Sequence, residues 1–206
     1  TLFVHIGATL SSVLVGLVIG VLSAAALGYV VAKTPILEDA LSPLIVAVQS
    51  TPVVAYAPLL VIWFGSGPTS KIVTSALIVF FPMLMNTIVG LRGVSLPLRD
   101  LMRSLESTRW QMFIHLELPA AMPVLLGGLK ISATLAVIGA VVGEFVSANA
   151  GLGYLINVGR SQYDTPLVIV AVLTLTGIAR VLYGLVSMLE GKLLGWQRRA
   201  HHSNGV

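Results

Sequence analysis

The chain has 206 residues, of which 56% are hydrophobic and only 10% are charged, and its formal net charge is +4. A soluble domain carries about 25% charged residues, so a soluble fold of this composition would leave too much apolar surface in water. The composition therefore predicts an integral membrane protein, with the positive charge on cytoplasmic loops and not on a nucleic-acid surface. The chain lacks cysteine, which excludes disulfides and thiolate chemistry.

Five apolar stretches are long enough to cross a bilayer, since a spanning helix needs about 20 mainly apolar residues. They cover residues 5–32, 36–65, 69–91, 118–145 and 165–189. The predicted fold class is therefore all-α, with one transmembrane domain over residues 1–206. A loop rich in Gly and Asn, residues 147–164, precedes the last span and contains a short apolar piece that could re-enter the membrane. Residues 192–206 form a polar tail.

The second apolar stretch is interrupted in its middle. Pro52 removes a backbone donor and clashes with the preceding turn, so we expect the helix to break there. Gln49, Ser50 and Thr51 come just before it. Polar residues at mid-membrane depth are tolerated where they are buried or line a cavity. Two interpretations stay open: these residues line a translocation pathway, or Ser and Thr satisfy backbone carbonyls at a proline kink.

The positions of Lys and Arg predict the orientation. If residues 92–117 are cytoplasmic, alternation of the spans leaves only Lys71 and Arg160 on the opposite side. The cytoplasmic side then holds Lys33, Arg92, Arg99, Arg103, Arg109, Lys192, Arg198 and Arg199. This asymmetry is the positive-inside pattern. Lys130 and Arg180 fall within spans. We favour snorkelling toward the cytoplasmic face for both; the alternative is a pair with Glu144 or Glu190.

Residues 92–117 are the one long charged interruption of the chain. Ser95 is predicted to cap a short helix with Pro97 in its first turn. The apolar side chains of this helix recur at i, i+3, i+4 and i+7, which gives one apolar stripe. They are Leu98, Leu101, Met102 and Leu105.

A second short helix is predicted to follow. Thr108 and Gln111 have the spacing of a capping box, so this helix should start near Arg109, with Trp110 on its apolar face. Pro119 can open the next membrane helix. The result is a helix-turn-helix close to the bilayer surface. It could dock a second protein or rest on lipid headgroups.

This segment resembles the cytoplasmic signature of ABC-importer permeases, the MetI-like family, which reads roughly Glu-Ala-Ala, then a glycine, then a run that ends in Leu-Pro. Asp100 stands where the glutamate is usual, Glu106 stands at the glycine position, and Leu118-Pro119 is the closing pair. Glu106 replaces a residue that can take a positive φ, so the turn could differ from the usual one.

Two further stretches agree with this resemblance. Residues 49–65 resemble the broken-span motif of the nitrate, sulfonate and taurine branch of these permeases. Gly143-Glu144 together with residues 151–156 resembles the loop before the last helix in that branch. Members of the family usually carry one more N-terminal helix, so the resemblance implies a core of five transmembrane helices with one helix missing at the start.

The resemblance implies a permease subunit of an ATP-driven ABC importer in the bacterial cytoplasmic (inner) membrane. The permease would be no enzyme itself and would bind no cofactor, with ATP and Mg on a partner ATPase; the chain has no G-x-x-x-x-G-K-[ST] pattern. Its implied partners are cytoplasmic ATPase subunits, a second permease copy and an extracytoplasmic binding protein. The solute would be of the nitrate, sulfonate or taurine type, or a heterocyclic vitamin precursor such as hydroxymethylpyrimidine or riboflavin.

The site residues implied by this reading fall into two groups. Those of the ATPase-coupling segment are Asp100, Arg103, Leu105, Glu106, Arg109, Trp110, Leu118 and Pro119. Those of the translocation pathway are Gln49, Ser50, Thr51, Pro52 and Glu144. For Glu144 a gate or proton relay competes with the interpretation that we favour, a helix-end carboxylate near the external interface. The histidines show no metal-ligand spacing within a span. The alternative function, an ATP-independent secondary transporter, predicts two related halves, which the sequence does not show.

Overall fold

The computed structural model describes residues 2–194, and over this range the chain is built of helices and their connections. Four helices are long and apolar enough to cross a membrane, or five spans if a bent pair counts as one. The predicted polar tail falls mostly on residues 195–206, so its Arg198, Arg199, His201 and His202 lie outside the described residues.

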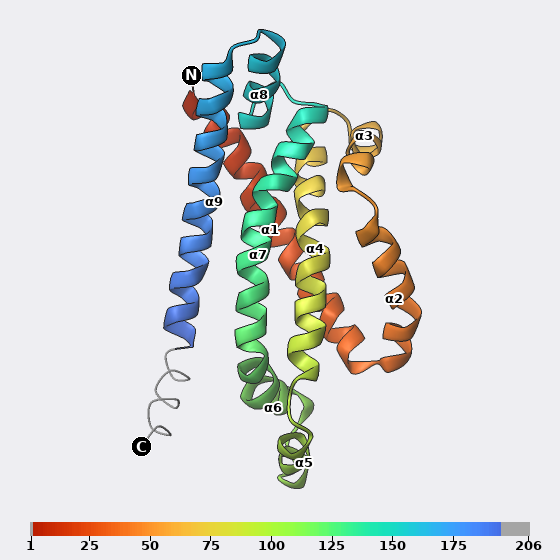
Figure 1. The fold of residues 1–206 in the computed structure, drawn as a ribbon. Helices are drawn as coiled ribbons and strands as arrows, with labels where there is room; N and C mark the ends of the chain where they lie inside the picture. Colours follow the sequence, from red (N-terminus) through yellow and green to blue (C-terminus); the bar gives the residue numbers. More distant parts are fainter. Residues whose placement is uncertain (1, 195–206) are drawn as a thin grey trace.

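Four long helices form the bundle in Figure 1, three of them upright and the first one oblique behind them. They are α1 (Leu2–Lys33), α4 (Pro68–Arg92), α7 (Leu118–Val146) and α9 (Thr165–Leu193). Helix α4 packs most extensively, against both α1 and α7, and α9 lies along α7. These elements confirm the predicted spans at 5–32, 69–91, 118–145 and 165–189.

Small residues allow the three central helices to approach closely. A Cβ atom added to Gly16 or Gly20 of α1 would lie 2.6 Å from Ser75 or 2.7 Å from a carbonyl oxygen of α4. On α7, a Cβ at Gly139 would lie 2.6 Å from the Cα atom of Ser75. Lipid tails are as apolar as leucine, so close van der Waals packing is the main attraction between membrane helices. Glycine at these contacts therefore sets the geometry of the bundle core.

The second span is broken, as predicted. Helix α2 (Pro35–Ser50) ends just before Pro52, helix α3 (Val53–Phe64) begins just after it, and the two are bent by 95°. Of the residues of α2, only Ile45 is buried. Figure 1 shows α2 standing to one side of α4.

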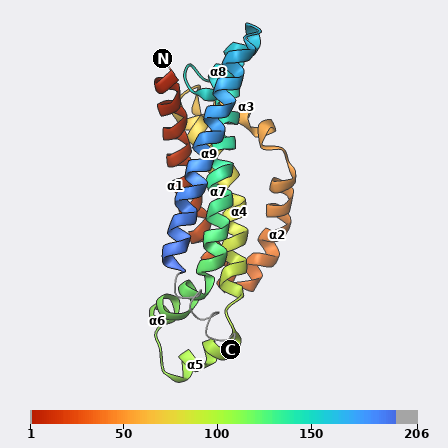
Figure 2. The same cartoon turned by 60° about the vertical axis from the view of Figure 1, so that its left-hand side comes forward.

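Short helices lie at the two ends of the bundle. Helices α5 (Leu96–Ser104) and α6 (Arg109–Met112) lie at one end, where a π-helical turn, η1 (Phe113–Glu117), leads into α7. Helix α8 (Leu152–Ser161) lies at the opposite end, near the start of α1 (Figures 1 and 2). We call these the α5 end and the α8 end. The predicted charged helix-turn-helix is confirmed, and the loop before the last span contains a helix.

Candidate functional site

The α5 end carries a short helix whose apolar stripe has no cover. No residue of α5 is buried, and Leu98, Leu101 and Leu105 are about half or more exposed. Ser95 occupies the N-cap position, but its side chain makes no capping hydrogen bond, so that predicted cap is wrong in detail. An amphipathic helix with its apolar face exposed needs a partner surface or a membrane.

The turn after α5 is left-handed at Glu106, whose φ is 52°. The Ser107 amide and hydroxyl both donate to the carbonyl oxygen of Met102, at 3.2 and 2.7 Å, and close the turn. A non-glycine residue in this region costs roughly 1–2 kcal/mol, so the hydrogen bonds hold Glu106 in a conformation that glycine takes freely. The substitution at the glycine position of the signature therefore leaves the turn with a positive φ.

Helix α6 starts as the sequence predicts. The Thr108 hydroxyl accepts from the Gln111 amide at 3.2 Å, and the Gln111 side chain accepts from the Thr108 amide at 2.8 Å, so the capping box is complete. Arg109 and Trp110 follow it, and Trp110 is 68% exposed. These two residues therefore present their side chains outward at the α5 end.

The remaining coupling candidates lie on either side of this turn. Arg103 pairs with Asp100 at 3.2 Å, and both side chains are about 70% exposed, so this is a surface ion pair of small energetic value. Leu118 and Pro119 are half-buried in the first turn of α7. The structure places all the coupling candidates at one end, on two separate helices and the start of a third.

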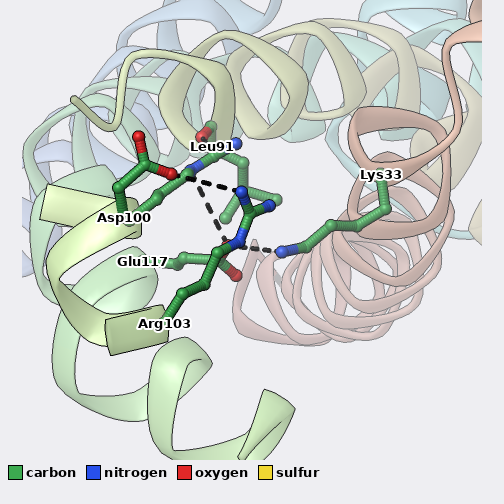
Figure 3. A network of polar contacts seen from close by, with 6 residues as sticks. Lys33, Leu91, Asp100, Arg103 and Glu117 are labelled. Carbon is green, nitrogen blue, oxygen red and sulfur yellow. Dashed lines mark hydrogen bonds and ion pairs between the residues drawn. The ribbon is translucent and has the colours of Figure 1, made fainter. Parts of the chain in front are cut away.

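A buried carboxylate anchors this end, and sequence reasoning missed it. Glu117 of η1 is 1% exposed and accepts from the ammonium group of Lys33 at the end of α1 (Figure 3). The Arg99 Nε atom of α5 lies 4.0 Å from the same carboxylate oxygen, and Arg99 also donates to the carbonyl oxygen of Leu91 at 2.7 Å. The signal in the sequence was a lone acidic residue at the start of an apolar helix, which requires a partner when it is buried.

This cluster, Lys33, Arg99 and Glu117, joins four elements. Lys33 belongs to α1, Arg99 to α5 and Glu117 to η1, and the carbonyl of Leu91 belongs to the last turn of α4. We call it the Glu117 cluster. It fixes the otherwise exposed α5 to the bundle through charged groups.

The predicted pathway residues at the α2–α3 break play two different roles. The hydroxyls of Ser50 and Thr51 donate to the carbonyl oxygen of Ala47, at 2.8 and 3.1 Å. This agrees with the interpretation that Ser and Thr satisfy backbone carbonyls at a proline kink. Pro52 stands at the N-cap of α3. Gln49 instead lines a cavity of about 300 Å³. The hydroxyls of Ser50 and Thr51 thus satisfy a backbone carbonyl at the proline kink, whereas a pathway role for Gln49 stays a prediction.

Glu144 lies near the end of α7, as expected, but it is not at an exposed interface. It is 1% exposed and accepts from the Thr9 hydroxyl of α1 and from the Gly153 amide of α8, both at 2.7 Å. The Thr9 hydroxyl in turn accepts from the Leu152 amide at 2.8 Å. These bonds satisfy amides at the start of α8, where the chain has unpaired donors. Glu144 therefore braces the helix at the α8 end.

The two basic residues within the spans, Lys130 and Arg180, were expected to snorkel toward the cytoplasmic face, and for Lys130 the structure differs from that expectation. Lys130 of α7 pairs with Glu190 of α9 and lies 5.8 Å from the centre of the Tyr183 ring. Snorkelling is therefore the wrong interpretation for Lys130, because a carboxylate on the neighbouring helix compensates its charge. Arg180 is exposed on the surface of α9.

Comparison with known proteins gives the family. The chain is 47% identical to the riboflavin transport system permease protein RibX of Chloroflexus aurantiacus over 78% of this chain and 60% of that protein's length. It is 36% identical to the formylaminopyrimidine transport permease protein ThiX of Halalkalibacterium halodurans over 96% of this chain and 79% of that protein. It is 31% identical to the taurine transport system permease protein TauC of Escherichia coli over 95% and 71% of the two chains.

The fold is also that of a solved structure. A chain of the MetNI methionine ABC transporter, in inward-facing conformations, superposes with a TM-score of 0.74 over 93% of both chains at 20% identity. The family model described as binding-protein-dependent transport system inner membrane component matches residues 16–195. The chain therefore belongs to the family of inner membrane components of binding-protein-dependent transport systems.

Proposed function

We propose that this chain is the permease subunit of an ATP-driven ABC importer and moves a small solute by alternating access. The observation that carries the proposal is α5, an amphipathic helix with an exposed apolar stripe that is fixed to the membrane bundle by the Glu117 cluster. A short helix held rigidly in this way transmits a displacement to the helices behind it. The α5 end is then the cytoplasmic end.

The proposed partner at this end is a cytoplasmic ATPase, which binds ATP and Mg. Leu101 and Leu105 would enter an apolar groove on the ATPase, and Arg103 and Arg109 would face acidic side chains at its rim. The half-exposed leucines suit the apolar core of such an interface, and the exposed Trp110 is of the residue type that contributes most to binding at its centre. A second copy of the permease and an extracytoplasmic binding protein complete the assembly.

The test is transport by the permease in liposomes with its ATPase and binding protein. We expect Arg103→Ala and Trp110→Ala to weaken ATPase binding by about tenfold each, which corresponds to about 1.4 kcal/mol, and to lower ATP-driven uptake. The matched control for ATPase binding is Tyr163→Ala at the α8 end, because Tyr163 is an aromatic side chain that is 93% exposed far from the proposed ATPase surface. All three variants should unfold at the wild-type temperature.

Two results would contradict the proposal. Wild-type transport rates in Arg103→Ala and Trp110→Ala would remove α5 and α6 from the coupling surface. Uptake that continues after ATP is depleted would favour a secondary transporter, the alternative function.

A further inference from the structure

A cavity lies at the point where the second span breaks. It has a volume of about 300 Å³ and is bounded by the end of α2, the start of α3, the middle of α4 and Leu135 of α7. Ligand sites are typically concave, mostly apolar and about 300–1,000 Å³ in size. The cavity is therefore large enough for a small solute and lies beside a backbone break at mid-span.

The lining of this cavity combines aromatic rings with one amide. Tyr56 of α3 and Phe81 of α4 contribute rings, Pro82 and Val53 add apolar surface, and Gln49 contributes the amide. Within residues 2–194, the Gln49 amide and the Tyr56 hydroxyl make no side-chain hydrogen bond. The neighbouring hydroxyls of Ser50 and Thr51 already donate to a backbone carbonyl oxygen. Two polar groups are thus left available at an apolar cavity.

The chemistry of the lining separates the candidate solutes. No charged residue lines the cavity. The cavity is partly open, since Gln49 is exposed and none of the lining residues is buried. A sulfonate or nitrate ion inside it would still exchange part of its hydration for apolar walls without gaining a cation, which is unfavourable. The feature that favours an anion is the positive end of α3 at Val53. A neutral ring with donor and acceptor atoms at its edge loses less hydration free energy on entering the cavity. The Gln49 side-chain amide can replace its hydrogen bonds to water, because an amide offers both a donor and an acceptor.

We propose that this cavity binds a small, neutral aromatic heterocycle, with its faces against Tyr56 and Phe81 and its polar edge on Gln49. Offset or edge-to-face contacts between aromatic rings contribute beyond the area that they bury. The proposal rests on the proposed transport function and names its solute class. Two of the relatives above carry the names of heterocycles, riboflavin and formylaminopyrimidine.

The experiment measures equilibrium binding of radiolabelled formylaminopyrimidine and of taurine to the purified permease–ATPase complex without the binding protein. We expect the wild type to bind the pyrimidine and not taurine. Gln49→Leu, which removes the amide at similar size, should weaken binding by about fivefold, which corresponds to about 1 kcal/mol, the typical contribution of one hydrogen bond. Phe81→Leu should weaken it by a similar factor through the lost ring contact.

Gln162→Leu is the matched control, because Gln162 is exposed at the α8 end, away from the cavity, and this variant should bind like the wild type. Binding of taurine in place of the pyrimidine, absence of pyrimidine binding, or unchanged pyrimidine binding in both cavity variants would each overturn the proposal. The same preparations report whether the ATPase remains bound at the α5 end. Loss of the ATPase from the wild type would contradict the proposed function, whereas a retained ATPase with unaffected cavity variants would contradict the solute site alone.

Discussion

The ion pair between Lys33 and Glu117 makes a sharp prediction, because its two partners differ in exposure. The Glu117 side chain is 1% exposed and the Lys33 side chain is 37% exposed. Lys33→Met leaves a carboxylate that water does not reach. Glu117→Gln leaves an ammonium group that water still reaches. We therefore expect Lys33→Met to destabilise the protein more than Glu117→Gln does.

The expected losses in the free energy of unfolding follow from how buried each partner is and from the charge that remains beside it. Removal of one partner of a fully buried ion pair costs about 3–5 kcal/mol. Arg99 at 4.0 Å from Glu117 offsets part of the charge that Lys33→Met strands, so we expect a loss of about 2–4 kcal/mol in the free energy of unfolding. For Glu117→Gln we expect about 1–2 kcal/mol, because Lys33 becomes hydrated. The double variant should cost less than the sum, with an interaction energy of about 1–3 kcal/mol.

The measurement is a double-mutant cycle on the permease in detergent micelles, with unfolding followed by tryptophan fluorescence. Hydrogen exchange of residues 96–104 reports in parallel whether α5 is released from the bundle. Arg103→Met is the control, because the Arg103–Asp100 pair is largely exposed and its loss should cost less than about 1 kcal/mol. A Lys33→Met variant that is no less stable than Glu117→Gln, or a cycle that is additive within about 0.5 kcal/mol, would refute this reasoning.

Three further predictions concern single contacts, each checked by the unfolding free energy in micelles. Gly139→Ala should destabilise by about 1–3 kcal/mol, because its Cβ would lie 2.6 Å from backbone of α4, whereas Gly127→Ala has open space and should be neutral or stabilising by up to about 1 kcal/mol; equal effects would contradict this. Glu106→Gly should stabilise by up to about 1 kcal/mol by relieving a positive φ, and a loss of stability would show that the turn is not strained. Thr9→Val should lower the free energy of unfolding by about 1–3 kcal/mol, because Glu144 loses a hydrogen-bond donor, and should speed amide exchange in the first turn of α8, because the Leu152 amide loses its acceptor. Unchanged exchange would contradict a role of this network in holding α8.

Features that depend on neighbouring residues could be predicted from the sequence. The break at Pro52 follows from the geometry of proline, and the start of α6 follows from the spacing of Thr108 and Gln111. Both are present in the structure. The spans follow from apolar length alone, since the bilayer thickness fixes how many residues a helix needs.

Features that depend on residues far apart could not be predicted in the same way. Lys33 and Glu117 are 84 positions apart, and Thr9 and Glu144 are 135 positions apart. Hydropathy shows where each of these residues lies within or at the end of an apolar stretch, but not which partner compensates it. For Lys130 the sequence allows snorkelling or an ion pair with Glu144 or Glu190, and the packing of α7 on α9 identifies Glu190 as the partner. A buried charge thus predicts that a partner exists, whereas the fold identifies it.

The two buried glutamates give α7 a specific mechanical position. At one end Glu117 binds Lys33 of α1 and faces Arg99 of α5; at the other end Glu144 binds Thr9 of α1 and the first turn of α8. Helices α1 and α7 are therefore tied together at both ends by polar contacts that are costly to break, in addition to their contacts along the bundle. In the proposed importer, a displacement applied to α5 would therefore reach both helices together and would arrive at α8 without relying on α2, of which only Ile45 is buried.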